Sequence, residues 1–255
     1  MSARTYTSPR FLLRAALRRL GLEVSRYRPR GREHLPAAVE EEFRDLYKTY
    51  HAYSMIRWSG LYTAWRAARH IADHKIEGAV VECGVWKGGC AAIMAEAFMT
   101  ANEGRDFYLY DTYEGMSEPT EHDRSMSTGH SAETLYEAYE GDWSVGALEI
   151  VKKVMEQTGL PKVHTHFVKG KVEDTLPKTA PEKIALLRLD TDWYESTKIE
   201  LELLYPKLAK GGILIVDDYG AWSGSKKAVD EYFADKKSPF FAYDPSTGNI
   251  SGVKE

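Results

Sequence analysis

The chain has 255 residues, enough for one α/β domain with extensions rather than for two full domains. Its formal net charge of −4 and its pI near 6.1 give no reason to expect nucleic acid or a membrane as partner. The two cysteines form no Cys-x-x-Cys pair, so a disulfide scaffold is not expected and a reducing cytoplasm is the expected location.

Residues 1–32 are strongly basic, with nine arginines and one acidic residue. After the helix start signal Ser8-Pro9, apolar residues recur at roughly helical spacing and predict a basic amphipathic helix. We interpret it as a helix docked on its own domain or on a second subunit; the alternatives are a membrane surface or an Arg-rich transit peptide. Arg14 interrupts the apolar residues, which argues against a signal peptide, and no run approaches the ~18 apolar residues of a membrane span.

Two helices are predicted next, from Pro36 to about Tyr50 and from Ile56 to about His74, with a hinge at His51–Met55 between them. His70 and His74 would share a helix face, as zinc ligands can. No third ligand stands nearby in the sequence, so we prefer a surface or capping role for both histidines.

The predicted sheet begins with Ala79–Cys83, after which Gly84-Val-Trp-Lys-Gly-Gly89 turns the chain into a helix that runs to about Thr100. Glycines here let the backbone approach a ligand closely at a helix N-terminus, although packing alone can also require them. Their spacing is not the G-x-G-x-x-G of a dinucleotide-binding fold. A second strand, Phe107–Asp111, ends in a carboxylate that can accept both hydroxyls of a ribose or, alternatively, cap a helix.

The long polar segment from Thr112 to Asp142, with a weak helix near Ala132–Tyr139, is typical of a functional lid or a disordered loop. Because it directly follows the second strand, we favour a lid. His122 and His130 lie within it and either can touch a substrate, although solvent-facing histidines are commoner.

A helix from about Ser144 to Thr158 leads to a third strand, Val163–Val168. Two acids, Glu173 and Asp174, follow the end of this strand. Either can meet the amino group of an adenine, and capping of a short turn before Pro177 is the equally good alternative.

Two apolar runs, Ile184–Leu189 and Ile213–Val216, each end in acidic residues, and an amphipathic segment from Glu195 to Leu208 separates them. This pattern predicts two parallel buried strands joined by a helix, which places the acids at strand carboxyl ends, where open α/β sheets bind ligands. Several carboxylates at one edge repel each other unless a cation or a proton lies among them. We therefore expect a divalent metal there, with simple capping of the following turns as the alternative. The acids are Asp190, Asp192, Asp217 and Asp218.

A last helix from about Ser225 to Ala234 and a closing hairpin of Phe240–Tyr243 and Asn249–Val253 complete the predicted elements. Four motifs then stand out together. They are Val81-Glu-Cys-Gly-Val-Trp-Lys-Gly-Gly89, Tyr110-Asp-Thr-Tyr-Glu-Gly-Met116, Leu189-Asp-Thr-Asp-Trp-Tyr-Glu-Ser-Thr197 and Gly211-Gly-Ile-Leu-Ile-Val-Asp-Asp-Tyr-Gly220. In order and spacing they resemble the macrocin O-methyltransferase family, metal-dependent enzymes that use S-adenosylmethionine to methylate hydroxyls of sugars and related natural products.

The resemblance implies a Rossmann-like class I methyltransferase fold: α/β, with a seven-stranded, mostly parallel sheet whose last strand is antiparallel, plus an N-terminal helical extension and lid. It divides the chain into that extension, residues 1–74, and an S-adenosylmethionine-dependent methyltransferase domain, residues 75–255. It implies Asp192 as the catalytic base. The implied Mg²⁺ ligands are Asp190, Asp217 and Asp218, and the implied cofactor-binding residues are Met55, Glu82, Gly84 and Asp111. We add Trp86, Asp174 and Asp190 to the expected cofactor-binding residues.

The chemistry suits these residue types. Oxygen ligands favour a hard cation such as Mg²⁺, which can lower the pKa of a bound substrate hydroxyl. Asp192 can then take the proton as the hydroxyl attacks the methyl group. We expect methyl transfer to a deoxysugar such as a rhamnosyl group, in a glycosylated natural product or a nucleotide sugar.

Three other functions stay open at this point: a catechol or phenolic O-methyltransferase, an NAD-dependent sugar oxidoreductase, and a non-catalytic nucleoside- or metal-binding module. The absence of G-x-G-x-x-G and of a recognisable Tyr-x-x-x-Lys pair argues against the oxidoreductase. The expected partners are a small-molecule sugar or glycoside acceptor and further copies of the chain in a homo-oligomer, with neither nucleic acid nor a membrane.

Overall fold

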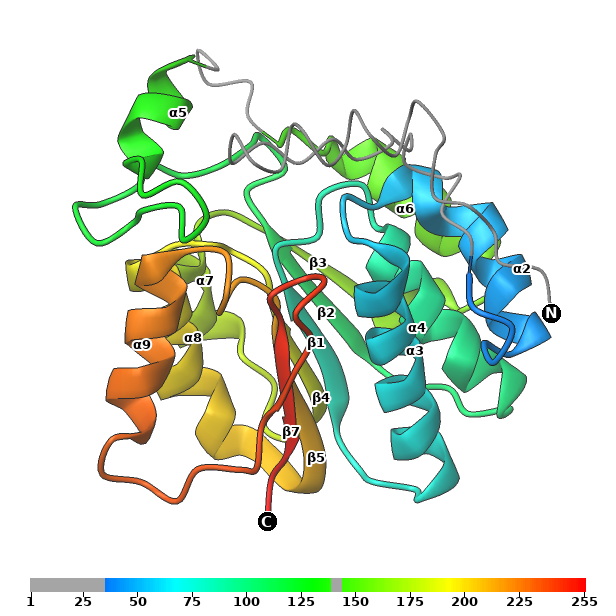
Figure 1. Cartoon of the computed structure of the whole chain (residues 1–255). Coiled ribbons are helices and arrows are strands. Elements are labelled where there is room, and N and C mark those ends of the chain that lie inside the picture. Colours follow the sequence, from blue (N-terminus) through cyan, green and yellow to red (C-terminus); the bar gives the residue numbers. More distant parts are fainter. Residues whose placement is uncertain (1–34, 139–143) are drawn as a thin grey trace, which may run out of the picture. The chain divides into compact units, whose positions relative to one another are not determined.

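A seven-stranded sheet forms the centre of the protein in the computed structural model, which describes residues 35–138 and 144–255 (Figure 1). The strand order is β3-β2-β1-β4-β5-β7-β6. The first five strands run parallel, and β7 is antiparallel to both of its neighbours. The strands are β1 (Ala79–Cys83), β2 (Phe107–Asp111), β3 (Thr165–Lys169), β4 (Ile184–Leu189), β5 (Leu208–Val216), β6 (Ala242–Tyr243) and β7 (Ile250–Val253). The expected class I methyltransferase fold, with its antiparallel last strand, is confirmed.

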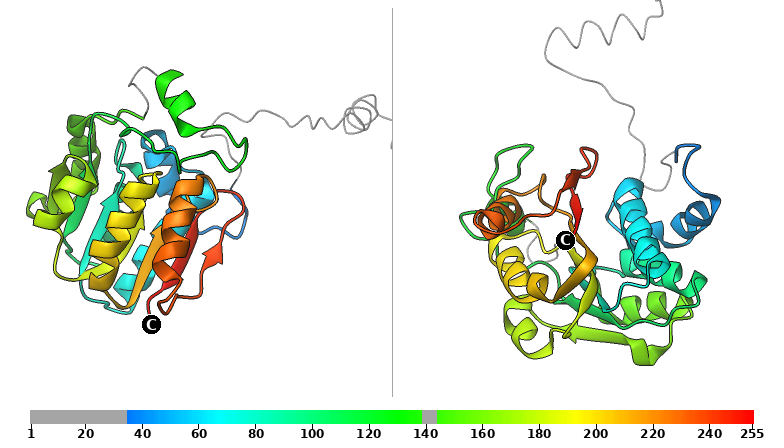
Figure 2. Two further views of the ribbon diagram at one scale, coloured as in Figure 1. Left: turned by 90° about the vertical axis from the view of Figure 1, so that its left-hand side faces the viewer. Right: turned by 90° about the horizontal axis from the view of Figure 1, so that it is seen from below.

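Helices cover both faces of this sheet (Figures 1 and 2). On one face α3 and α4 contact each other, and α4 also contacts α2 and α6; on the other, α8 contacts α7 and α9. The helices are α2 (Glu41–Tyr50), α3 (Trp58–Asp73), α4 (Gly89–Thr100), α5 (Ala132–Ala138), α6 (Leu148–Gln157), α7 (Val172–Thr179), α8 (Tyr194–Leu204) and α9 (Ser223–Phe233). Because both faces are covered, every residue of β1 and β4 is buried, as their continuous apolar runs predict.

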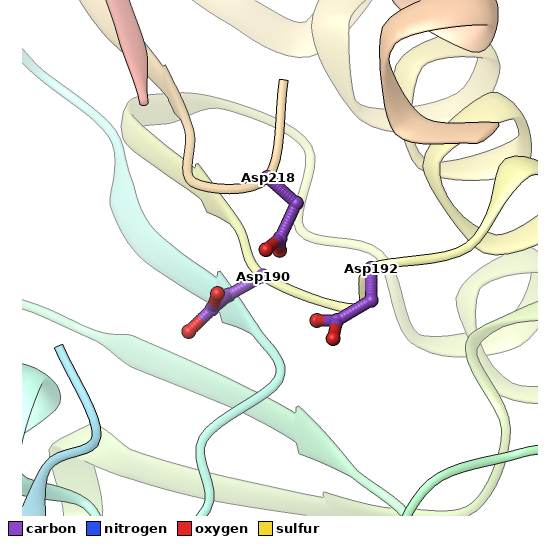
Figure 3. A group of neighbouring side chains, drawn as sticks. All are labelled: Asp190, Asp192 and Asp218. Carbon is purple, nitrogen blue, oxygen red and sulfur yellow. The ribbon is translucent and has the colours of Figure 1, made fainter. Parts of the chain in front are cut away.

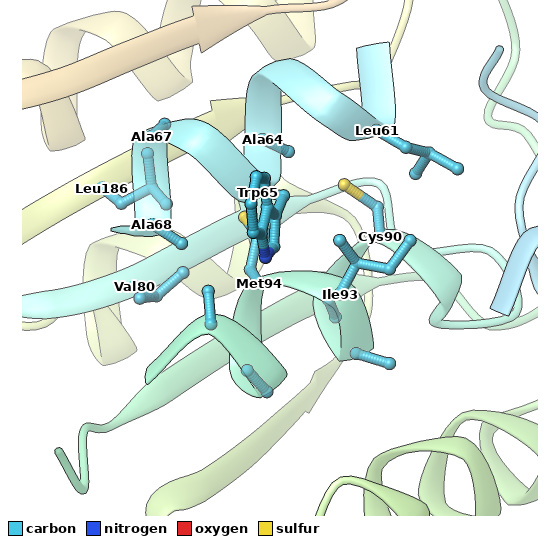
Figure 4. Packing of buried hydrophobic residues seen from close by; sticks show 14 of the residues in the cluster. Leu61, Ala64, Trp65, Ala67, Ala68, Val80, Cys90, Ile93, Met94 and Leu186 are labelled. Carbon is cyan, nitrogen blue, oxygen red and sulfur yellow. The ribbon is translucent and has the colours of Figure 1, made fainter. Parts of the chain in front are cut away.

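Alternate residues of the central strands enter two separate hydrophobic clusters. Val80 and Leu186 pack with α3 and α4, whereas their neighbours Val81 and Leu187 pack with α7 and α8. Figure 4 shows the first cluster, in which Trp65 of α3 reaches down between the two helices. This double packing holds the strand ends, and with them the acidic residues, in a fixed frame.

Several element boundaries differ from the predicted ones. Helix α6 begins at Leu148 rather than Ser144, and a short 3₁₀ turn at Lys162–His164 delays the start of β3. The predicted short turn before Pro177 is in fact helix α7, which tolerates the proline because it lies in the last turn and removes a single backbone hydrogen bond. The predicted basic helix of residues 1–32, and the end of the predicted lid at 139–142, lie outside the described residues.

Helices α2 and α3 share the core of the sheet. The rings of Phe43 and Trp65 lie 5.6 Å apart between centroids, and Tyr50 donates a hydrogen bond to Glu96 of α4 at 2.6 Å. Residues 35–255 accordingly form one compact unit, so among the described residues the packing has no boundary at residue 74. The role of residues 1–74 as extension and lid stays a prediction. None of the helices in residues 35–138 and 144–255 combines the length and the apolar character that a membrane span requires.

Candidate active site

A pocket lies where β1, β2, β3 and β4 end. It is bounded by the glycine-rich turn after β1, by the chain that follows β2 and β3, and by the first residues after β4. This is the edge at which the sequence places the cofactor. Its lining includes Gly84, Asp111, Met116, Lys171, Glu173, Asp190 and Thr191.

The glycine-rich turn is shaped by close backbone contacts. Gly84 has a φ of +83°, and a Cβ at this position would lie 2.0 Å from the backbone oxygen of Asp190. The Asp111 carboxylate accepts backbone N–H bonds from Val85 at 2.7 Å, Trp86 at 2.9 Å and Tyr113 at 2.7 Å. The Thr112 hydroxyl adds a longer bond at 3.4 Å, so four donors within the protein already face its four acceptor positions, and its bonds to a ribose stay a prediction. Asp111 therefore organises the turn as well as lining the pocket.

Arg188 is the centre of a buried charge cluster beneath the pocket. Its side chain is 1% exposed, and its guanidinium lies 3.0 Å from Glu82, 2.8 Å from Asp190 and 2.9 Å from Asp217. Burial raises the pKa of Glu82 to about 7, with Arg188 acting in the opposite direction. Arg188 contacts one carboxylate oxygen each of Asp190 and Asp217, which leaves their second oxygens for another ligand.

Three carboxylates converge beside this cluster (Figure 3). Asp190, Asp192 and Asp218 each offer an oxygen, and these oxygens lie within 4.8 Å of one another. Burial, and then the charge of Asp190, raise the pKa of Asp192 to about 8, and burial likewise raises the pKa of Asp190 and of Asp218. Asp218 Oδ2 is buried and has no hydrogen-bond partner among residues 35–138 and 144–255. The donor set and this unpartnered oxygen fit a hard divalent cation.

Asp192 has an unusual backbone conformation. Its φ of +68° is rare for a residue with a side chain, and such strain is often found at functional sites. The Trp222 side chain hydrogen-bonds the Asp192 carboxylate. The backbone N–H of Trp193 donates to the Thr191 carbonyl at 2.8 Å. The tight turn thus holds Asp192 next to Asp190 and Asp218.

The structure places the remaining predicted site residues less centrally. Met55 is 39% exposed, with its sulfur 3.9 Å from the Ser144 hydroxyl. Trp86 lies in the glycine-rich turn with a φ of +48°. Of the two acids after β3, Glu173 lines the pocket, whereas Asp174 is exposed. The cofactor contacts expected of Met55, Trp86 and Asp174 stay predictions.

Sequence reasoning missed Arg188. The signal is present in the sequence, because one arginine interrupts the apolar run of β4 and one glutamate interrupts that of β1. Since these strands are neighbours, Glu82 and Arg188 pair directly in the sheet. A lone charged residue inside a buried strand therefore indicates an opposite charge on an adjacent strand.

A family model described as Macrocin-O-methyltransferase (TylF) matches residues 14–242 of the chain. Demethyldecarbamoylnovobiocin O-methyltransferase of Streptomyces niveus is 32% identical over 209 residues, which cover 79% of this chain and 76% of that protein. The 8-demethyl-8-(2,3-dimethoxy-alpha-L-rhamnosyl)-tetracenomycin-C 4'-O-methyltransferase of Streptomyces olivaceus is 33% identical over 159 residues, 62% of this chain and 58% of that protein.

The structure of the O-methyltransferase NovP is also similar, with a TM-score of 0.68 and 27% identity over 79% of this chain and 82% of that one. The family match covers most of the chain and includes all four motifs. It sets aside the two alternatives that are not methyltransferases. The chain therefore belongs to the macrocin O-methyltransferase family and is an S-adenosylmethionine-dependent O-methyltransferase.

Proposed function

We propose that the protein methylates a hydroxyl of a deoxysugar, such as a rhamnosyl group, in a glycosylated natural product or a nucleotide sugar. The observation that carries this proposal is the position of Asp190, which both lines the pocket and belongs to the group of three carboxylates. A methyl donor in the pocket and an acceptor at the carboxylates would therefore meet side by side. The rhamnosyl group in the name of the Streptomyces olivaceus relative supports the substrate class.

A divalent cation, with Mg²⁺ as the expected ion, fits the carboxylate group. We propose Asp190 and Asp218 of that group as ligands, together with the neighbouring Asp217, and we keep Asp192 as the base. Arg188 engages one oxygen each of Asp190 and Asp217 and leaves the other oxygen available. When bound, such an ion lowers the pKa of a substrate hydroxyl beside it. Asp192 stays within reach as the proton acceptor, and its raised pKa makes it a stronger base than an exposed aspartate.

The other residues orient the reactants. The glycine-rich turn, held in place by Asp111, brings the backbone of Gly84 to the wall of the pocket in which the methyl donor would bind. Trp222, which hydrogen-bonds Asp192, is partly exposed and its flat face suits a sugar ring, while the buried Trp193 packs edge to face against it with centroids 5.0 Å apart. S-adenosylmethionine supplies an already activated methyl group, so the task of the protein is to align the hydroxyl and accept its proton.

The test combines binding and turnover. Purified protein would be titrated calorimetrically with S-adenosylmethionine and S-adenosylhomocysteine, with and without Mg²⁺, and then assayed for transfer of a labelled methyl group to rhamnosides and to catechol. Binding of either cofactor form together with rhamnoside methylation supports the proposal. Methylation of catechol alone would assign the protein to phenolic acceptors, and failure of the folded protein to bind either cofactor form would refute the donor site.

Mg²⁺ affinity is expected to weaken as the pH falls from about 8.5 to about 6.5. Burial raises the pKa values of two proposed ligands, Asp190 and Asp218, so near neutral pH protons compete with the metal for these carboxylates. Each proton released on binding changes the affinity by up to about tenfold per pH unit. Titrations with Mg²⁺ at three pH values measure the slope, and an affinity independent of pH would contradict the proposed ligand set.

A further inference from the structure

The segment between β2 and α5, predicted to be a lid, is attached along residues 117–131, which we name the docked loop. The Trp193 indole N–H donates to the Ser117 carbonyl at 2.9 Å, and the Ser223 N–H donates to the Arg124 carbonyl at 2.9 Å. The Met126 N–H bonds the Ala221 carbonyl at 2.8 Å. These bonds hold the docked loop against the amino ends of α8 and α9, in the upper part of Figure 1.

Asp123 is the buried centre of the docked loop. Its side chain is 0% exposed, and one carboxylate oxygen accepts the N–H of Thr120 at 2.7 Å and the Thr120 hydroxyl at 2.9 Å. The other oxygen accepts the N–H of Tyr194, the first residue of α8, at 2.8 Å. The helix N-cap position, Trp193, has no oxygen in its side chain. Asp123 therefore caps α8 from a distant part of the chain.

Gly224 makes this contact possible. It lies near the start of α9, and a Cβ added there would lie 1.8 Å from Asp123 Oδ1. Alanine is normally preferred over glycine inside a helix by about 1 kcal/mol. The close approach of the Asp123 carboxylate gives a physical reason for glycine at this position.

The docked loop thereby contacts both segments that carry the three carboxylates, the one after β4 and the one after β5. On one side Asp123 holds Tyr194, two residues after Asp192. On the other side a β-bridge joins Ser125 to Trp222, whose side chain hydrogen-bonds Asp192 and whose N–H bonds the Asp218 carbonyl at 3.0 Å. These contacts are on the α8 and α9 side of Asp192. Ser117 is the residue of the docked loop that the cofactor pocket shares, and it is held by the Trp193–Ser117 bond, which does not involve Asp123.

We propose that Asp123 is a positioning residue for the acceptor substrate: it fixes the docked loop as a wall of the acceptor site and holds the turn that carries Asp192. The inference rests on the proposed function, since it assigns the acceptor to this side of the carboxylates. The proposal predicts an effect on the acceptor and not on S-adenosylmethionine, because Asp123 contacts elements next to Asp192 but does not line the cofactor pocket.

The first test compares Asp123→Ala with Glu202→Ala, which removes an exposed acid in the body of α8, outside the docked loop. For the rhamnoside with the highest wild-type turnover, Asp123→Ala should lower kcat/KM about 10- to 100-fold, with a raised acceptor KM, because a misplaced wall and base disturb alignment. The calorimetric Kd for S-adenosylmethionine should stay within about twofold, as it should for Glu202→Ala, which keeps full activity. If the Kd for S-adenosylmethionine rose by the same factor by which kcat/KM falls, Asp123 would support the whole active site rather than the acceptor site, and the proposal would be wrong.

The second test is independent of methyl transfer. Trypsin cleavage after Arg124, identified by fragment mass, should accelerate about tenfold or more in Asp123→Ala, because the docked loop opens more often. Gly224→Ala should reproduce this acceleration by displacing the carboxylate, and the double variant should cleave little faster than either single one. Unchanged cleavage in Asp123→Ala, or full additivity in the double variant, would show that Asp123 does not hold the docked loop in place through Gly224. A wild-type protein that binds cofactor but methylates no rhamnoside refutes the substrate proposal instead.

Discussion

Replacing Asp192 by asparagine is expected to lower the rate of methyl transfer about 100- to 10,000-fold while S-adenosylmethionine still binds. Asparagine matches the size of aspartate but cannot take a proton. Because the pKa of Asp192 is raised to about 8 by burial and by the charge of Asp190, the wild-type carboxylate is a base well matched to neutral pH. Single-turnover kinetics with saturating cofactor and acceptor would measure the chemical step directly.

The matched control is Glu195→Gln, which removes an exposed acid three residues further along and should leave the rate unchanged. A second comparison tests whether Asp192 acts as the base or as a metal ligand. Mg²⁺ affinity should change only a few-fold in Asp192→Asn but fall about tenfold or more in Asp218→Asn, which removes a proposed ligand oxygen. If both variants lose Mg²⁺ equally, Asp192 is a ligand and the base must be sought elsewhere.

The place of the acidic residues could be predicted from the sequence because it follows from local pattern. Apolar runs such as Ile184–Leu189 fix the strands, and parallel strands necessarily bring their carboxyl ends to one edge. The same reasoning located the glycine-rich turn and Asp111. It also gave the closing hairpin, whose antiparallel strand distinguishes this sheet from one that is parallel throughout.

The division of roles among the acids could not be predicted, since it depends on contacts between residues far apart in the chain. Asp217 and Asp218 are adjacent in sequence, yet Asp217 faces Arg188 of the next strand while Asp218 joins Asp190 and Asp192. The pairing of Asp123 with Gly224 spans about a hundred residues and leaves no local pattern. In polar loops, the residues that become buried occur singly, so the sequence shows none of the periodicity that indicates a strand or a helix.

Replacing Arg188 by methionine is expected to destabilise the protein by about 3–5 kcal/mol at pH 8. The guanidinium is the buried cation shared by Glu82, Asp190 and Asp217, and its loss would leave three neighbouring carboxylates without compensation. Methionine fills a similar volume, so the effect reports charge rather than a cavity. Denaturant unfolding followed by circular dichroism gives the free energy of unfolding of both proteins.

The pH dependence of this difference identifies its cause. Arg188 lowers the pKa of Glu82, which burial nevertheless raises to about 7, so without Arg188 the pKa must rise further. A group whose pKa is raised on folding stabilises the folded state below its unfolded pKa, and this contribution is lost as the pH rises through the folded value. The destabilisation by Arg188→Met should therefore be largest at about pH 8 and shrink towards about pH 5, where Glu82 is protonated. Arg188→Met combined with Glu82→Gln should recover part of the stability at pH 8, because one uncompensated charge is gone. A destabilisation of equal size at both pH values would show that packing, rather than the buried carboxylates, accounts for the role of Arg188.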